Sequence, residues 1–136
     1  MKAVGIEIDK KRAICVIVSK DANGILQNVT GKTKYIEIKD DHNNQEIQDF
    51  LQKVETFFDE VAPNSIGIIS RQTKGKFAAA SVSFKLEALI QCYKKTEITF
   101  VSKQTLTAYY KKNELPVSYD NAYQENATRL ATYLLR

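Results

Sequence analysis

The sequence predicts an α/β fold in which a mixed β-sheet carries helices on both faces. The first observation is an N-terminal hairpin followed by a third strand, which is typical of an antiparallel meander. The second is the alternation of helix and strand patterns after residue 44, which is typical of parallel strands joined by helical crossovers. The third is size: 136 residues, 43% of them hydrophobic, suit a single domain over residues 1–136.

The N-terminal hairpin is the part around which the predicted sheet is arranged. Alternate residues from Val4 to Ile8 are apolar, at the two-residue period of a strand, and residues 13–18 are apolar on both faces. The basic turn Asp9-Lys10-Lys11-Arg12 joins the two strands. Glu7 lies inside the first strand, and an unpaired buried carboxylate is costly. We therefore expect Glu7 to have a partner, a proton, a metal ion or an open cleft.

The remaining elements follow from periodicity and from turn residues. After the Asn-Gly turn at residues 23–24, the third strand is irregular, is interrupted by Gly31 and is clearest at Lys34–Lys39, which suits an exposed edge. Asn43 is expected to cap a helix that ends before Pro63, with Glu46 completing a capping box. The later elements are expected to be a buried strand at 65–70, a helix at 77–95, a strand at 97–101, a helix at 102–112 and a helix from about 120 to near the end.

Composition favours a cytoplasmic, soluble protein. The chain opens directly into a strand without a signal peptide, and no apolar run reaches membrane-spanning length. Cys15 and Cys92 both lie in apolar patterns, so we expect two buried free thiols. The net charge of +4 is compatible with nucleic acid but is no more than a hint.

Several motifs resemble known families. Gly5-Ile6-Glu7 resembles the Gly-Ile-Asp opening of RuvC-type Holliday junction resolvases. The segments IEIKDDH, TKGKF and FKLEALIQ resemble a small bacterial family, domain of unknown function 3010, over nearly the whole chain. These resemblances imply a ribonuclease H-like three-layer fold, with a mixed five-stranded sheet in the order 3-2-1-4-5 and helices on both faces.

In resolvases of this kind, acidic residues on strand one, at the end of the fourth strand and on the last helix bind two divalent metal ions. The resemblance therefore makes Glu7 a metal and catalytic candidate, with Mg²⁺ or Mn²⁺ as the cofactor. The further catalytic candidates are Glu125 and Asp120. The chain departs from the pattern where Ser70 and Asn126 occupy the cleft-lining positions. These departures predict a degenerate metal site.

Three polar motifs have two readings each. The loop with Arg71, Lys74 and Lys76 lies between a strand and a helix N-terminus, where it could bind nucleic-acid phosphates or remain a solvated surface loop. Asp40-Asp41-His42 is either a metal cluster or a group of anions at a helix start. The stretch Tyr109–Lys112 could stack on exposed bases or close an amphipathic helix.

Three functions remain open at this point. A metal-dependent nuclease would use Glu7 with Glu125 or Asp120. A non-catalytic protein would bind DNA or RNA through the basic loop. A protein-interaction module, for example a homodimer formed through the edge strand Lys34–Lys39, would bind no nucleic acid.

Overall fold

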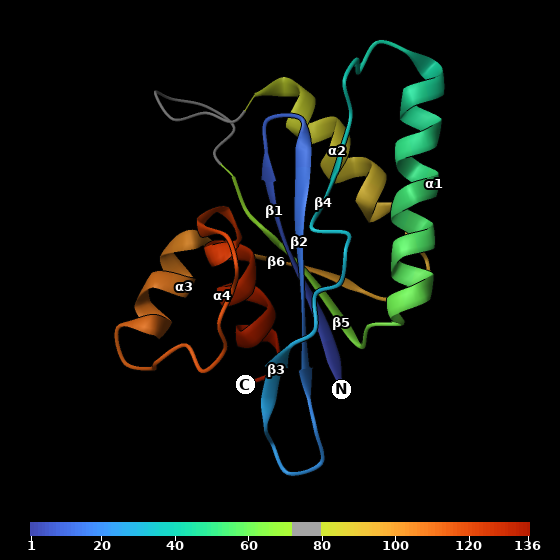
Figure 1. The fold of residues 1–136 in the computed structure, drawn as a ribbon. Helices are drawn as coiled ribbons and strands as arrows, with labels where there is room; N and C mark the ends of the chain where they lie inside the picture. The colour runs from blue at the N-terminus through green and yellow to red at the C-terminus, as the bar shows by residue number, and fades with distance from the viewer. Residues whose placement is uncertain (72–79) are drawn as a thin grey trace.

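The computed structural model describes residues 1–71 and 80–136 and shows three layers, with a twisted sheet between two pairs of helices (Figure 1). The two termini lie close together at one end of the molecule. The elements in chain order are β1 (Lys2–Asp9), β2 (Arg12–Lys20), β3 (Leu26–Asn28), β4 (Tyr35–Glu37), α1 (Asn44–Val61), β5 (Ser65–Ile69), α2 (Ser81–Gln91), β6 (Ile98–Val101), α3 (Lys103–Tyr110), the short 3₁₀ helix η1 (Ala122–Gln124) and α4 (Glu125–Leu134).

Strand β1 lies near the middle of the sheet, as the sequence predicts. The order is β3-β2-β1-β5-β6, with β4 also paired to β2. β1 is antiparallel to β2 and parallel to β5, and β5 is parallel to β6. The predicted order 3-2-1-4-5 is thus confirmed, with β5 and β6 as its fourth and fifth strands.

The predicted third strand is two short segments, so among the described residues the sheet has six strands where five were expected. Val18 pairs with Asn28, whereas Ile14 pairs with Tyr35, so the chain advances by seven residues, from 28 to 35, where β2 advances by four, from 14 to 18. The hydroxyl of Thr30 accepts a hydrogen bond from the backbone N–H of Ile17 at 3.0 Å. A side chain thereby replaces a backbone partner, and the extra residues loop out between β3 and β4.

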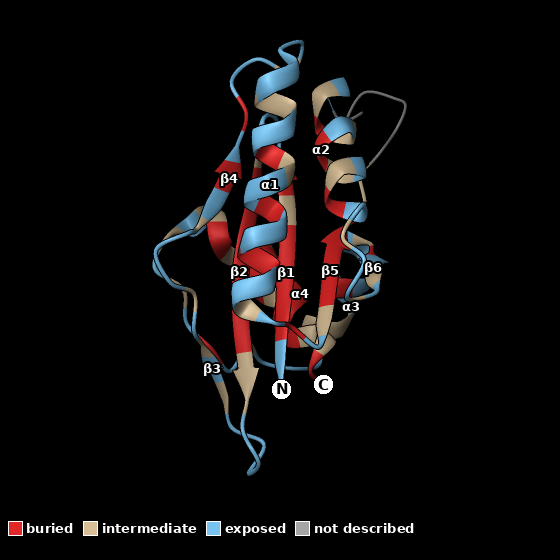
Figure 2. Cartoon of the chain, turned by 90° about the vertical axis from the view of Figure 1, so that its right-hand side faces the viewer, coloured by how far each residue is buried: buried red, intermediate tan, exposed pale blue. Residues whose placement is uncertain are grey.

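Helices α1 and α2 cover one face of the sheet, and their inner sides are buried (Figure 2). The side chain of Asn43 accepts hydrogen bonds from the N–H groups of Gln45 and Glu46, so the predicted N-cap is confirmed. Glu46 does not complete the capping box, because its Oε1 accepts from the N–H groups of Lys39 and Asp40 instead, at 2.9 and 3.1 Å. These two hydrogen bonds connect the loop after β4 to the first turn of α1.

Helix α4 packs directly on β1 at the other face. A Cβ added at Gly5 would overlap the carbonyl oxygen of Ala127 and lie 2.7 Å from the backbone N of Ala131. Only glycine allows the helix backbone to approach the strand this closely. This approach brings the first turn of α4 next to Glu7, two residues further along β1.

Two sequence-based expectations need correction. Cys15 is buried, but Cys92 is exposed, because α2 ends at Gln91 and the helix presents Ser83, Leu86 and Ile90 to the core instead. The helix expected at 77–95 is therefore shorter at its C-terminal end, and residues 77–79 lie outside the described ranges. Across residues 1–71 and 80–136, every helix is too short or too polar to span a membrane.

Candidate functional site

The topology brings the sequence-predicted cleft residues to one edge of the sheet. The parallel strands β1, β5 and β6 end at this edge, near the turn between β1 and β2 (Figure 1). In open α/β sheets, ligands bind outside the carboxyl ends of the strands. Glu7 lies near the end of β1, Ser70 follows β5, and α3 begins directly after β6. We use the name Glu7 cleft for the four residues Glu7, Ser70, Lys103 and Asn126 at this end of the sheet.

The carboxylate of Glu7 has one hydrogen-bond donor and one ion-pair partner. Asn126 Nδ2 donates to Glu7 Oε2 at 2.9 Å, so the structure brings these two predicted residues together. Lys103 Nζ lies 3.6 Å from the same oxygen. The Glu7 side chain is 16% exposed, whereas that of Lys103 is 60% exposed. Glu7 is thus a partly buried carboxylate whose charge is balanced from within the chain.

The two other predicted acids lie in different surroundings. Glu125 Oε1 forms an ion pair with Arg129 Nη2 at 3.1 Å, one helical turn further on. Its Oε2 accepts a hydrogen bond from the hydroxyl of Tyr119 at 2.8 Å, which raises the pKa of that phenol. Both oxygens of Glu125 are therefore engaged by partners other than Glu7. Asp120 is exposed in the segment before η1.

The basic loop is described only at its first residue. Arg71 pairs with Glu87 of α2 at 2.9 Å, and its guanidinium carbon lies 4.5 Å from the centre of the Phe84 ring. The Arg71 side chain is only 9% exposed, so it anchors the start of the loop to α2. Lys74 and Lys76 lie outside the described residues. Ser70 continues the sheet, since its N–H donates to the carbonyl of Val101 at 2.9 Å.

Arg12 is clamped between two tyrosines at the base of the hairpin turn. Its guanidinium carbon lies 5.1 Å from the ring centre of Tyr35 and 4.7 Å from that of Tyr123. The rings themselves meet edge to face, with centres 6.2 Å apart. Asp9 approaches the guanidinium at 3.6 Å. A cation stacked on aromatic faces keeps the edge of its guanidinium available for an anion.

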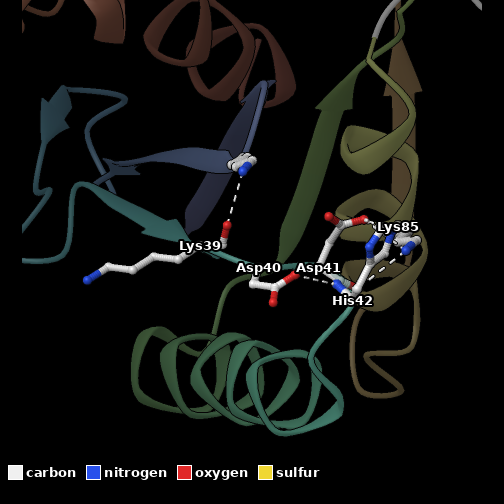
Figure 3. Close-up of polar contacts among 6 residues, drawn as sticks. Lys39, Asp40, Asp41, His42 and Lys85 are labelled. Carbon is white, nitrogen blue, oxygen red and sulfur yellow. Dashed lines mark hydrogen bonds and ion pairs between the residues drawn. The ribbon is translucent and has the colours of Figure 1, made fainter.

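The motif Asp40-Asp41-His42 joins the start of α1 to α2 (Figure 3). Lys85 Nζ lies 2.8 Å from Asp41 Oδ2, and Asp40 Oδ1 accepts from the backbone N–H of His42 at 3.0 Å. The hydrogen bond from Lys85 is the main cause that lowers the pKa of Asp41. His42 Nε2 is 3.9 Å from the Asp41 carboxylate. Asp41 therefore links the segment before α1 to α2 through its ion pair with Lys85.

The aromatic residues at the end of α3 pack against α4. The rings of Tyr109 and Tyr133 have centres 5.1 Å apart. The hydroxyl of Tyr110 donates to the carbonyl of Arg129 at 2.7 Å, and burial raises the pKa of Tyr110 to about 12. These contacts are those of a helix–helix interface, and exposed Lys111 and Lys112 follow it.

The residues of the Glu7 cleft do not fit a two-metal centre. Mg²⁺ and Mn²⁺ bind oxygen ligands, whereas Asn126 and Lys103 both offer N–H groups to Glu7. Within the described residues, no group of three or more His, Cys, Asp or Glu side chains could hold a metal ion. The arrangement can orient a carboxylate and present cations to a ligand.

Sequence reasoning missed Lys103 and Arg12. A signal for Lys103 exists, because Ser102 caps α3 and Lys103 is the first helical residue, where the helix dipole disfavours a cation. Its partner, however, lies on β1. The sequence shows Arg12 only as part of a basic turn, because its two tyrosines come from β4 and η1, which are distant in the chain.

Solved structures place the molecule in a class. The fold is similar to that of Thermus thermophilus RuvC, with a TM-score of 0.70 and 9% identity over 99% of this chain and 94% of that one. The same values describe T. thermophilus RuvC in complex with a Holliday junction substrate. The yeast mitochondrial Holliday junction resolvase gives a TM-score of 0.58 and 12% identity over 98% of this chain and 75% of that one. The chain thus has a RuvC-like, ribonuclease H-like fold.

Sequence comparison then gives the family. Residues 1–134 match the model described as protein of unknown function DUF3010. The chain belongs to the DUF3010 family, as the motifs IEIKDDH, TKGKF and FKLEALIQ indicate. A search of curated proteins found no match.

Proposed function

We propose that this DUF3010 protein binds nucleic acid through the edge of the sheet that carries the Glu7 cleft, without hydrolysing it. The observation that carries the proposal is the state of Glu7, whose carboxylate is held by Asn126 and Lys103 in a RuvC-like fold. A phosphodiesterase of this kind needs carboxylates that share metal ions. The Glu7 carboxylate accepts a hydrogen bond from an amide and pairs with the Lys103 ammonium, so it positions a cation.

Cations on neighbouring elements support contact with a polyanion. Lys10 and Lys11 are exposed at the hairpin turn, and Lys103 is exposed at the start of α3. Arg12, the first residue of β2, adds a guanidinium stacked on the Tyr123 ring. Such groups neutralise phosphates and make binding depend on salt.

A four-way DNA junction is the first ligand to test, because T. thermophilus RuvC has been solved with a Holliday junction substrate. Lys74 and Lys76, which follow Arg71 in the sequence, remain proposed phosphate contacts. We also propose a cytoplasmic protein. We expect fluorescence anisotropy to show junction binding that weakens as salt rises. The double variant Lys74→Ala/Lys76→Ala should lower the slope of log affinity against log salt by about 2, at roughly 0.9 per lost phosphate contact.

A matched control removes two lysines from the opposite edge of the sheet. Lys2→Ala/Lys94→Ala changes the net charge equally, and both residues are exposed. We expect its salt slope to match that of the unaltered protein. Equal losses in both double variants would mean that binding reflects overall charge alone. An absence of binding at low salt would favour the protein-interaction module instead, with the edge segment Lys34–Lys39 as the contact to test for a homodimer.

A further inference from the structure

We infer that Lys103 supplies, from within the chain, the positive charge that a divalent ion would bring to Glu7, and that it excludes such ions from the cleft. The inference rests on the proposed function and explains how the cleft can face a polyanion without a metal. Its basis is the mismatch between the donor-rich surroundings of Glu7 and the oxygen ligands that a metal requires.

The position of the ammonium is the first step. Lys103 Nζ lies 3.6 Å from Glu7 Oε2, on the same oxygen that accepts the hydrogen bond from Asn126. A Mg²⁺ ion bound to that oxygen would lie at about 2.1 Å and would carry its own waters. The ammonium occupies the space that this hydrated ion needs, and its charge repels the ion.

The amide is the second step. Asn126 directs Nδ2, its donor atom, at Glu7. An amide could bind a cation only through Oδ1, so the side chain would have to turn over and give up its hydrogen bond to Glu7. Both neighbours therefore complement an anion, and neither offers an oxygen to a metal.

A lysine at the first position of α3 is unfavourable for the helix itself. Lys103 is the first residue of α3, where the helix dipole is positive and acidic side chains are favoured. Ser102 already caps this end by accepting from the N–H of Thr105 at 3.1 Å. The helix itself therefore gives no reason for a cation here, whereas Glu7 does. The high exposure of Lys103 leaves its remaining N–H groups able to contact a phosphate.

The test measures where Mn²⁺ binds, in the absence of nucleic acid. Paramagnetic broadening of amide NMR signals around Glu7 and Asn126 detects even low occupancy by the ion. The proteins are the unaltered chain, Lys103→Met, Lys103→Arg and the double variant Lys103→Met/Glu7→Gln. Position 103 is exposed, so these proteins should fold, and their amide spectra check this directly.

We expect Lys103→Met to show broadening near Glu7 at an Mn²⁺ concentration about tenfold lower than the unaltered protein, because a like charge has been removed. Lys103→Arg should resemble the unaltered protein, and the double variant should lose the effect. Equal broadening in the unaltered protein and in Lys103→Met would overturn the inference, as would no broadening in Lys103→Met. Junction binding measured in EDTA tests the proposed function separately.

Discussion

At the residue scale, the role of Glu7 depends on the side chains around it more than on its being a carboxylate. A carboxylate in a strand of this fold suggests metal chemistry from sequence alone. The structure instead gives it one amide donor at 2.9 Å and one ammonium at 3.6 Å. Each of these groups lowers the cost of keeping a charge that is only 16% exposed. Through Asn126 and Lys103, Glu7 links β1 to α4 and to α3.

This view predicts how substitutions at position 7 affect stability. Glu7→Ala leaves the Asn126 amide without its acceptor and should lower the free energy of unfolding by about 1–3 kcal/mol. Glu7→Gln should cost less, because its amide oxygen can still accept from Asn126. Urea denaturation of the three proteins makes the comparison. A Gln variant as unstable as the Ala variant would show that the hydrogen bond contributes nothing.

At the element scale, the contact between α4 and β1 sets the geometry of the cleft. Gly5 allows the helix backbone to lie on the strand, and the same helix carries Asn126 to Glu7. Gly67, on the neighbouring β5, faces the side-chain tips of Leu130 and Leu134 instead. Backbone atoms cannot move aside as side-chain tips can, so the two glycines differ in what they tolerate.

Alanine at the two glycines should therefore have unequal effects. Gly5→Ala forces α4 away from β1 and should destabilise the protein by about 3 kcal/mol or more, whereas Gly67→Ala should cost about 1–2 kcal/mol. Thermal unfolding monitored by circular dichroism measures both. Equal and small effects would mean that α4 does not pack as closely as the structure shows.

The tether between Asp41 and α2 predicts a pH dependence. Because Lys85 lowers the pKa of Asp41 below 3.8, the ion pair stabilises the folded state above that pH and loses its effect as pH falls through the lowered pKa. Carboxyl NMR should show Asp41 titrating at lower pH in the unaltered protein than in Lys85→Met. The stability difference between these two proteins should shrink as pH falls below 3.8. The same titration midpoint in both would rule out this role of Lys85.

At the scale of the whole molecule, the sequence pattern predicted the elements of the fold better than the contacts within the site. Strand alternation, the Asn43 cap and the helix end before Pro63 were predicted because they depend on neighbours in the chain. The split of the third strand was not, since it depends on the Thr30 hydroxyl reaching β2. The partner of Lys103 also required the fold, because β1 and α3 meet only when the sheet is complete.

The whole molecule thus combines a RuvC-like fold with a cleft whose charges are balanced internally. We propose that such a cleft binds nucleic acid and leaves it intact. The most direct measurement incubates an end-labelled four-way junction with the protein in Mg²⁺ and in Mn²⁺, followed by native and denaturing gels. We predict a salt-sensitive complex on the native gel and full-length strands on the denaturing gel. Cleavage that requires the metal ion and disappears in Glu7→Gln would contradict the claim.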